Sequence, residues 1–325
     1  MPRTPTIVLT PVLEPEVVAI GRDKLPPGFA LEVVPARELA TALPETDYLL
    51  GFVGSLSDEL LLGASRLKLV QLMSVGYDTF NLAGARRVRL PVAVNGGANA
   101  IGVAEHTIML MLAALKRLTE LNAEVHSGVW RGGMSGARLY ELWGSTVGIV
   151  GLGRIGQAVA RRLGGWEAEL IYFDPVPAPP ERAEALGVRR VSLEELLARA
   201  DVVTLHIPLS DATRHIVDAG ALGLMKRTAT LVNTARGGLI DEAALVDALD
   251  RQALGGAALD VLSAEPPPPD HPLLGRANVI VTPHTAGPTW QSWPRRFENS
   301  FANIARVERG ERPEWVVPEL HDLVS

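Results

Sequence analysis

Three glycines with the spacing Gly-x-Gly-x-x-Gly constrain the fold of this chain more than any other feature of its sequence. They follow the β-branched run Thr146–Val150, a predicted buried strand, and they open a segment with helical periodicity. Gly151 would form the tight turn after the strand. Gly153 would let the backbone approach a pyrophosphate, and Gly156 would let helix and strand pack closely. Strand, fingerprint and helix together predict a dinucleotide-binding βαβ unit.

An acidic residue stands where such a unit needs one. Asp174 ends the next predicted strand, eighteen residues after Gly156, where its carboxylate would accept hydrogen bonds from an adenosine ribose and repel a 2′-phosphate. Pro175 follows, and no Arg occupies the next few positions, so NAD is favoured over NADP. The helix N-terminus, with Arg154 and Ile155, would face the phosphates. The alternative is a glycine-rich structural turn with an acidic surface residue.

After Thr146 the chain alternates short β-branched runs with amphipathic segments, the pattern of parallel strands joined by crossover helices. Six strands are expected, at Thr146–Val150, Leu170–Phe173, Val202–His206, Thr230–Val232, Ala257–Val261 and Val279–Val281. Ser192 with Glu195 forms a capping-box pattern, and Asp241 is the expected cap of another helix. The prediction is an α/β fold with a doubly wound parallel sheet of the Rossmann type.

The N-terminal part repeats this pattern more loosely, which predicts a smaller, flavodoxin-like α/β unit. Its apolar runs are Ile7–Leu9, Tyr48–Val53, Leu69–Met73 and Val92–Val94. The 325 residues suffice for two domains. Because the helical pattern Ser292–Glu308 is expected to return to the N-terminal unit, we predict a discontinuous domain at 1–100 and 288–325 and a dinucleotide-binding domain at 101–287.

Composition argues against several classes of function. The formal net charge is −6 and no run of Lys and Arg occurs, so neither a nucleic acid nor an anionic membrane is an expected partner. The chain has no cysteine, which fits a reducing compartment. Met1–Leu13 lacks a signal-peptide pattern, and the apolar segment Thr107–Leu115 is too short to span a bilayer. We expect a soluble, cytoplasmic protein without a metal site.

Three further segments each end a predicted strand, at the edge where open α/β sheets bind ligands. They contain Arg236, then Asp260 and Glu265, then His284. In this order and behind the glycine fingerprint, they resemble the D-isomer-specific 2-hydroxyacid dehydrogenase family, which includes D-lactate, D-glycerate and phosphoglycerate dehydrogenases. The resemblance covers nearly the whole chain. It implies hydride transfer between NAD and C2 of a small D-2-hydroxy acid or 2-oxo acid, with the discontinuous domain as the substrate domain.

The residue types fit the chemistry of 2-oxo acid reduction. That reaction needs a cation for the substrate carboxylate and carbonyl oxygen, and a proton donor for the developing alkoxide. The planar fork of Arg236 suits the first need and His284 suits the second. Glu265 beside the ring would stabilise the imidazolium, so that the pair acts as acid in reduction and as base in oxidation. Taken singly, these residues have plain alternatives: a surface salt bridge, a solvated turn and a packing histidine.

The resemblance also implies roles around the cofactor. Asp260 would lie near the nicotinamide carboxamide and help to fix the face from which hydride leaves. Thr234 and Ala235, directly before Arg236, and His206, at another strand end, are expected to line the cofactor groove.

On the substrate side, Ser74, Val75 and Gly76 follow a predicted strand. The family uses the backbone N–H groups of this loop to hold the substrate carboxylate, and the alternative is a simple strand-to-helix turn. Asn99 matches a family position that faces the cleft and would hydrogen-bond a substrate oxygen. The helix beginning near Gly102 implies a twofold homodimer, with a helix buried in a monomer as the competing account.

Single residues separate related activities. Formate dehydrogenases pair their histidine with Gln, so Glu265 argues against formate, and phosphite dehydrogenases place Lys where Val75 stands. Trp290 and Trp293 would either wall the substrate pocket or serve in packing. A non-catalytic, NAD-sensing interaction protein on the same scaffold is the alternative from another functional class.

Overall fold

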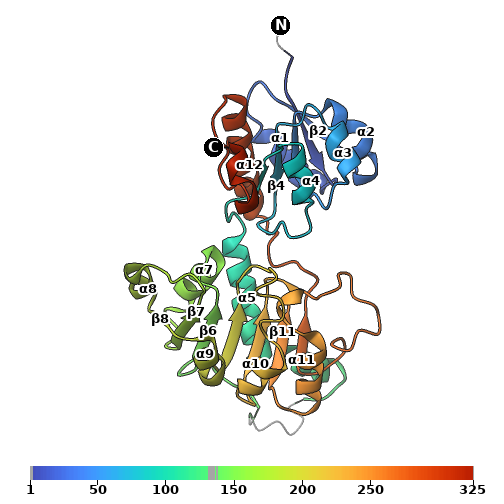
Figure 1. The fold of residues 1–325 in the computed structure, drawn as a ribbon. Coiled ribbons are helices and arrows are strands. Elements are labelled where there is room, and N and C mark those ends of the chain that lie inside the picture. The colour runs from blue at the N-terminus through green and yellow to red at the C-terminus, as the bar shows by residue number, and fades with distance from the viewer. Residues whose placement is uncertain (1–2, 131–135, 137, 325) are drawn as a thin grey trace. The chain divides into compact units, whose positions relative to one another are not determined.

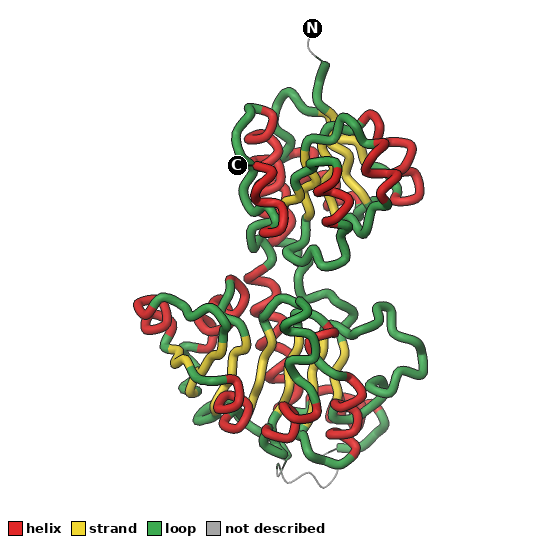
Figure 2. The backbone as a smooth tube through the Cα atoms, in the orientation of Figure 1, coloured by secondary structure: helices red, strands yellow, loops and turns green. Residues whose placement is uncertain are grey.

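The computed structural model describes residues 3–130, 136 and 138–324, and its chain divides into two compact units (Figures 1 and 2). Unit 1 comprises Met1–Asn99 and Pro288–Ser325, and unit 2 comprises Ala100–Gly287. Each unit has its own parallel sheet with helices on its faces.

The sheet of unit 1 has five strands in the order β2-β1-β3-β4-β5, all parallel. The strands are β1 (Thr6–Thr10), β2 (Ala30–Val33), β3 (Tyr48–Gly51), β4 (Leu69–Leu72) and β5 (Val92–Ala93). This order is the flavodoxin-like one, in which ligands bind beyond the carboxyl ends of the strands. The predicted smaller α/β unit is confirmed.

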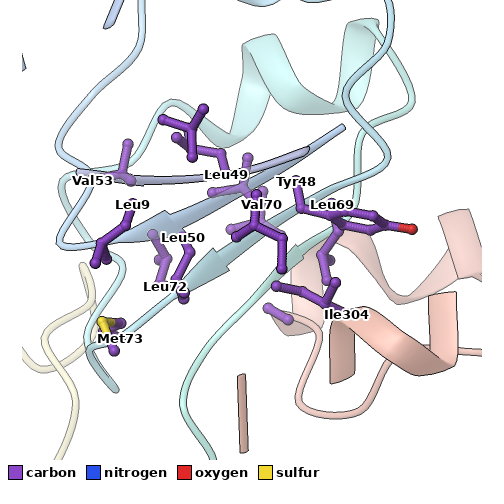
Figure 3. Close-up of a cluster of buried hydrophobic side chains, with 14 of the residues drawn as sticks. Leu9, Tyr48, Leu49, Leu50, Val53, Leu69, Val70, Leu72, Met73 and Ile304 are labelled. Carbon is purple, nitrogen blue, oxygen red and sulfur yellow. The ribbon is translucent and has the colours of Figure 1, made fainter. Parts of the chain in front are cut away.

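Helices cover the sheet of unit 1. They are α1 (Pro15–Asp23), α2 (Leu39–Ala42), α3 (Asp58–Gly63), α4 (Leu82–Arg87) and α12 (Ser292–Glu308), with 3-10 helices η1 (Ala36–Glu38), η2 (Leu43–Glu45) and η4 (Pro318–Val324). Helix α12 contacts β4 and α1, as its predicted return to this unit requires. Figure 3 shows Ile304 of α12 beside the buried strand residues Tyr48 and Leu69.

The sheet of unit 2 has seven parallel strands in the order β12-β11-β10-β9-β6-β7-β8. The strands are β6 (Thr146–Val150), β7 (Glu169–Phe173), β8 (Val188–Arg190), β9 (Val202–Leu205), β10 (Thr230–Asn233), β11 (Gly256–Leu259) and β12 (Val279–Val281). Strand order reverses at β6, which makes the crevice between β6 and β9 the topological switch point of a Rossmann fold.

Two layers of helices enclose this sheet. The helices are α5 (Ala100–Leu115), α6 (Leu118–His126), α7 (Arg154–Leu163), α8 (Pro180–Leu186), α9 (Leu193–Arg199), α10 (Ala219–Leu224) and α11 (Glu242–Asp250), with the 3-10 helix η3 (Gly237–Leu239). Helix α5 packs on α7, β10 and β11, while α9, α10 and α11 form the opposite layer (Figure 1). A helix with the length and apolar character needed to cross a bilayer does not occur in the part of the chain that the structure describes.

The structure corrects the expected number of strands. The sheet of unit 2 has seven strands rather than six, because β8 joins its edge, and β2 likewise joins the edge of the other sheet. The expected Val202–His206 and Ala257–Val261 are also too long, since β9 ends at Leu205 and β11 at Leu259. The caps at Ser192 and Asp241 are confirmed: each side chain accepts backbone N–H groups of the helix that follows it.

Candidate active site

Three neighbouring strands bring the predicted catalytic residues to one edge of the sheet of unit 2. Asn233, Leu259 and Val281, at the ends of β10, β11 and β12, lie in register. Beyond them the backbone stays linked: Asp260 N–H donates to the Asn233 carbonyl at 2.9 Å, and His284 N–H donates to the Asp260 carbonyl at 2.8 Å. The segments that carry the arginine, the glutamate and the histidine therefore leave the sheet side by side.

His284 and Glu265 form a contact at this edge. Nδ1 of His284 lies 2.6 Å from Oε2 of Glu265, and the side chains are 48% and 37% exposed. The other carboxylate oxygen of Glu265 accepts the Leu262 N–H at 3.0 Å, which fixes the orientation of the acid. Because Nδ1 is taken by the carboxylate, Nε2 is the ring atom that can exchange a proton with another molecule, and no described residue is hydrogen-bonded to it.

Asp260 holds the turn that carries His284. Its side chain is 1% exposed and accepts the Thr282 hydroxyl at 2.6 Å and the N–H groups of Thr285 and Ala286 at 3.0 and 2.9 Å. His106 of α5 supports the same cluster, with Nε2 3.0 Å from the Thr282 hydroxyl. The buried Asp260 carboxylate thus holds the turn that carries His284 through three hydrogen bonds. A contact between Asp260 and a nicotinamide stays a prediction.

Arg236 leaves β10 through a turn that Asn233 fixes. The Asn233 side chain donates to the Arg236 carbonyl at 2.8 Å and accepts the Ala235 N–H at 3.0 Å. The next residue, Gly237, packs so closely on the Leu262 backbone that a Cβ there would collide with the Leu262 carbonyl group. The arginine turn and the loop that leads to Glu265 are therefore in direct contact.

The glycine fingerprint has a distinct steric role at each position. Gly151 has φ +97°, a conformation that favours glycine, and a Cβ there would lie 2.7 Å from the His206 backbone. A Cβ on Gly156 would collide with the Gly151 carbonyl oxygen. Gly153 differs, because a Cβ there would meet nothing within 4 Å. Contacts with the described residues therefore do not require glycine at 153. This fits a position where a side chain would occupy the space of a ligand.

The same region offers donors and acceptors to a dinucleotide. Gly153 caps α7 without a side-chain hydrogen bond, so the first N–H groups of α7, which begins at Arg154 and Ile155, are available to an anion. The Asp174 carboxylate accepts the N–H groups of Leu152 and Val176 at 2.8 and 2.9 Å, which holds it at the end of β7. Each of its oxygens keeps further acceptor capacity for ribose hydroxyls.

Arg190 was not expected in this part of the site. Its guanidinium donates to the Asp174 carbonyl at 3.2 Å, across sixteen residues of sequence. Arg190 reaches this place because Tyr172 and Arg190 pair across β7 and β8. The sequence has no arginine close after Asp174, and only the recognition of β8 as a neighbouring strand would have indicated this one.

His206 and Thr234 follow β9 and β10. The His206 Nε2 is hydrogen-bonded to the Thr204 hydroxyl at 3.0 Å, whereas Nδ1 is buried with no partner among the described residues. Burial lowers the pKa of His206 to about 3, so the ring is neutral, and its orphaned Nδ1 fits a site that a bound group completes. The Thr234 hydroxyl is 2.9 Å from that of Thr107. The Ala235 backbone is engaged within the protein, because its N–H donates to Asn233 and its carbonyl accepts from the Arg236 guanidinium at 2.7 Å, so a cofactor contact of Ala235 stays a prediction.

The predicted substrate residues lie in unit 1. Ser74 donates its hydroxyl to the Gly76 carbonyl at 2.7 Å, which closes the Ser74–Gly76 loop on itself, with Val75 at its tip. Asn99 keeps a buried Oδ1 for which the described residues supply no hydrogen-bond partner. Trp293 packs in the core at 8% exposure, whereas Trp290 is 60% exposed.

Known proteins are similar to this chain in sequence and in fold. Residues 108–286, more than half of the chain, match the family described as D-isomer specific 2-hydroxyacid dehydrogenase, NAD binding domain. A glyoxylate reductase of Korarchaeum cryptofilum is 38% identical over 261 residues, which cover 80% of this chain and 78% of that protein. A D-3-phosphoglycerate dehydrogenase of Methanocaldococcus jannaschii is 40% identical over 301 residues, 92% of this chain but 56% of that protein. The chain therefore spans little more than half the length of that relative.

Among solved structures, the TT0316 protein from Thermus thermophilus matches with a TM-score of 0.84 and 35% identity, over 96% of this chain and 99% of that one. This match extends beyond the nucleotide-binding region to both units.

Proposed function

The chain belongs to the D-isomer-specific 2-hydroxyacid dehydrogenase family and is an NAD-dependent oxidoreductase; from this premise we propose that it converts a small 2-oxo acid and the corresponding D-2-hydroxy acid into each other, with His284 and Glu265 as the acid–base pair. The contact of 2.6 Å between these two side chains carries the proposal. Bound NADH supplies the hydride for reduction, and NAD accepts it in oxidation.

The geometry of the pair indicates which atom transfers the proton. In reduction, Nε2 of the His284 imidazolium gives its proton to the oxygen that becomes the 2-hydroxyl group, and in oxidation the neutral ring takes that proton back. Glu265 holds the ring through Nδ1, which leaves Nε2 for the substrate. Since the Leu262 N–H fixes Glu265, the ring is oriented before a substrate arrives.

Arg236 binds the substrate carboxylate and carbonyl oxygen. The Asn233 contacts and the close packing of Gly237 on Leu262 support this role, because they fix the backbone from which the guanidinium extends. A planar guanidinium can donate two parallel hydrogen bonds and polarise the carbonyl for hydride addition. The N–H groups of the Ser74–Gly76 loop, with Asn99, supply further contacts to the substrate.

The substrate is a short 2-oxo acid, with glyoxylate as the first candidate. The name of the Korarchaeum relative and the coverage of both chains support this choice. The phosphoglycerate dehydrogenase gives weaker support, because the chain lacks counterparts to a large part of that protein. Glu265 and Val75 continue to argue against formate and phosphite.

A steady-state assay tests the proposal. NADH oxidation is followed with glyoxylate, pyruvate, hydroxypyruvate and oxaloacetate, and at least one of them should be reduced. Glyoxylate gives achiral glycolate, whereas each of the other three should give the D-2-hydroxy acid, identified by chiral chromatography. Tight NADH binding without turnover across this panel would contradict the proposal and favour the sensor alternative.

We also propose that the protein forms a homodimer through α5, α6 and the described residues near them. The exposed large apolar side chains in this part of unit 2 include Ile101, Met109, Leu118, Val125, Trp130 and Trp143. Exposed apolar side chains of this size, clustered in one stretch of sequence, are typical of a protein contact. Sedimentation equilibrium should give twice the mass of 34.8 kDa, and Met109→Glu should shift the equilibrium toward the monomer.

A further inference from the structure

Arg296 is a buried positive charge in unit 1. The residue lies on α12 and is 2% exposed. Within the part of the chain that the structure describes, no carboxylate lies within 4.0 Å of its guanidinium. Burial and the charge of Arg295 lower the pKa of Arg296 to about 10, so the side chain is still charged at neutral pH. A buried charge without an opposite charge is costly, which calls for a reason beyond packing.

The partners of Arg296 point to the Ser74–Gly76 loop. One terminal nitrogen of its guanidinium donates to the Met73 carbonyl, directly before the loop, and Nε contacts the Ser292 hydroxyl at 3.4 Å. The rings of Phe52 and Trp293 lie 5.5 and 5.4 Å from the guanidinium carbon. These rings shield the cation from water without neutralising it, so its field is weakly screened.

The loop itself is arranged as a set of donors. The carbonyl groups of Met73, Ser74 and Gly76 accept hydrogen bonds from Arg296, from the Asn95 N–H at 3.0 Å and from the Ser74 hydroxyl at 2.7 Å. In contrast, no described residue accepts a hydrogen bond from the N–H groups of residues 74, 75 and 76. With three carbonyl groups occupied and three N–H groups free, this stretch of backbone fits an anion rather than a cation.

We propose that Arg296 is a positioning residue for anion binding by this loop: it fixes the Met73 carbonyl and supplies, from behind the peptide groups, the positive charge that neutral N–H donors lack. The inference rests on the proposed function in taking the anion to be the carboxylate of the 2-oxo acid. Arg296 does not contact the substrate in this account. It makes the loop selective for a carboxylate over an uncharged amide or ester of the same shape.

A set of three variants separates this role from packing. Arg296→Met keeps most of the apolar stem but removes the charge, Arg296→Lys keeps the charge, and Arg306→Gln removes a charge from a partly exposed site on the same helix. Because removal of the cation behind the loop weakens the attraction of the loop for an anion, R296M should raise KM for the best 2-oxo acid about 10- to 100-fold. Its kcat should change less than about threefold, and its NADH Kd should match the wild type.

The control variants give the decisive contrast. R296K should recover most of the wild-type KM, and R306Q should not differ from the wild type. A wild-type KM in R296M, or a fall in kcat at unchanged KM, would overturn the inference and leave Arg296 a packing residue. If R296M does not fold, the KM of R296K is the test. A KM raised about 100-fold in R296K would mean that keeping the charge has no effect, and this result would overturn the inference.

A binding measurement keeps the inference distinct from the proposed function. Oxamate, a stable monoanionic analogue of a 2-oxo acid, is titrated into the NADH-loaded protein and followed by NADH fluorescence. If the wild type reduces no acid in the panel, the proposed function fails, yet weaker oxamate binding by R296M than by R306Q would still support the role of Arg296. Equal oxamate affinity in these two variants, or no binding to the wild type, would overturn it.

Discussion

In the proposed reaction, His284 acts through one ring atom, Nε2, because Nδ1 is held by Glu265. Replacing His284 by Ala should lower kcat at least about 100-fold, the usual contribution of a general acid. NADH affinity should stay nearly unchanged, since the fingerprint glycines and Asp174 are intact. Steady-state kinetics and a fluorescence titration with NADH measure the two quantities. A parallel loss of cofactor binding would show that the histidine has been given the wrong role.

His206 gives a prediction about stability and pH. Burial lowers its pKa in the folded chain to about 3, whereas an unfolded histidine titrates near about 6.5. As pH falls below that unfolded value, the unfolded chain takes up a proton that the folded chain does not, so the group lowers stability progressively between the two values. The slope for one proton is at most about 1.4 kcal/mol per pH unit.

The matched variant is His206→Gln, which keeps a polar side chain and does not titrate. Urea unfolding at pH 7.5, 6 and 5 should show a smaller loss of stability with falling pH in H206Q than in the wild type. Other groups contribute equally to both proteins and cancel in the comparison. Identical slopes would mean that the imidazole becomes protonated in the folded state.

The sequence predicted the candidate site residues that belong to motifs. It did not indicate residues whose proposed role depends on their neighbours in three dimensions. His284, Glu265 and Arg236 follow strands in a recognisable order, and the structure links their three segments at one edge. Arg190 and Arg296 have no local pattern. Their importance comes from a neighbouring strand and from burial on α12, neither of which composition or spacing reveals.

Among the secondary-structure elements, β8 gives a prediction about cofactor choice. It pairs with β7 so that Arg190 reaches the carbonyl of Asp174, while Arg189 pairs with Glu169 at 3.1 Å and Glu195 at 3.4 Å. Asp174→Ala removes the carboxylate that repels a 2′-phosphate and leaves the exposed Arg190 to attract one. The ratio of kcat/KM for NADH to that for NADPH should fall at least about tenfold, about 1.4 kcal/mol.

Two arginine variants check the part played by β8. In the Asp174→Ala background, Arg190→Gln should lower kcat/KM for NADPH and return part of the discrimination. Arg189→Gln in the same background should leave the ratio where it was, because Arg189 pairs with Glu169 and Glu195 instead. Equal effects of the two changes would point to net charge rather than to a specific phosphate contact.

The elements that the sequence missed share one physical property. The strands β2 and β8 lie at sheet edges, where only one face or one neighbour favours apolar residues. In β8 two of three residues are exposed arginines, and in β2 only Leu31 is buried. The central strand β6 and the long helix α12 matched their predicted ranges to the residue, because a buried strand and a helix with one buried face leave a clear apolar pattern in the sequence. The edge strand β12 matched as well, because its three residues are all apolar.

The molecule as a whole has separate hydrophobic cores. One cluster of buried side chains consists of residues from unit 1, around β1, β3, β4 and α12. Two further clusters, on the two faces of the other sheet, consist of residues from unit 2. Among the described residues, none of these clusters combines side chains of both units. Burial of apolar surface drives folding. Because each unit has its own core, we expect each unit to fold and unfold cooperatively by itself.

NADH should therefore stabilise the two units unequally. At a concentration about 100 times its Kd, a ligand that binds only the folded state adds about 2.7 kcal/mol, and the fingerprint, Asp174 and His206 all belong to unit 2. Hydrogen exchange measured by mass spectrometry on the full chain should show NADH slowing exchange in peptides from β6, β9 and β10. Peptides from β1, β3 and β4 should exchange as before when no 2-oxo acid is present. Uniform protection of both sheets would instead mean that the chain opens as a single cooperative unit.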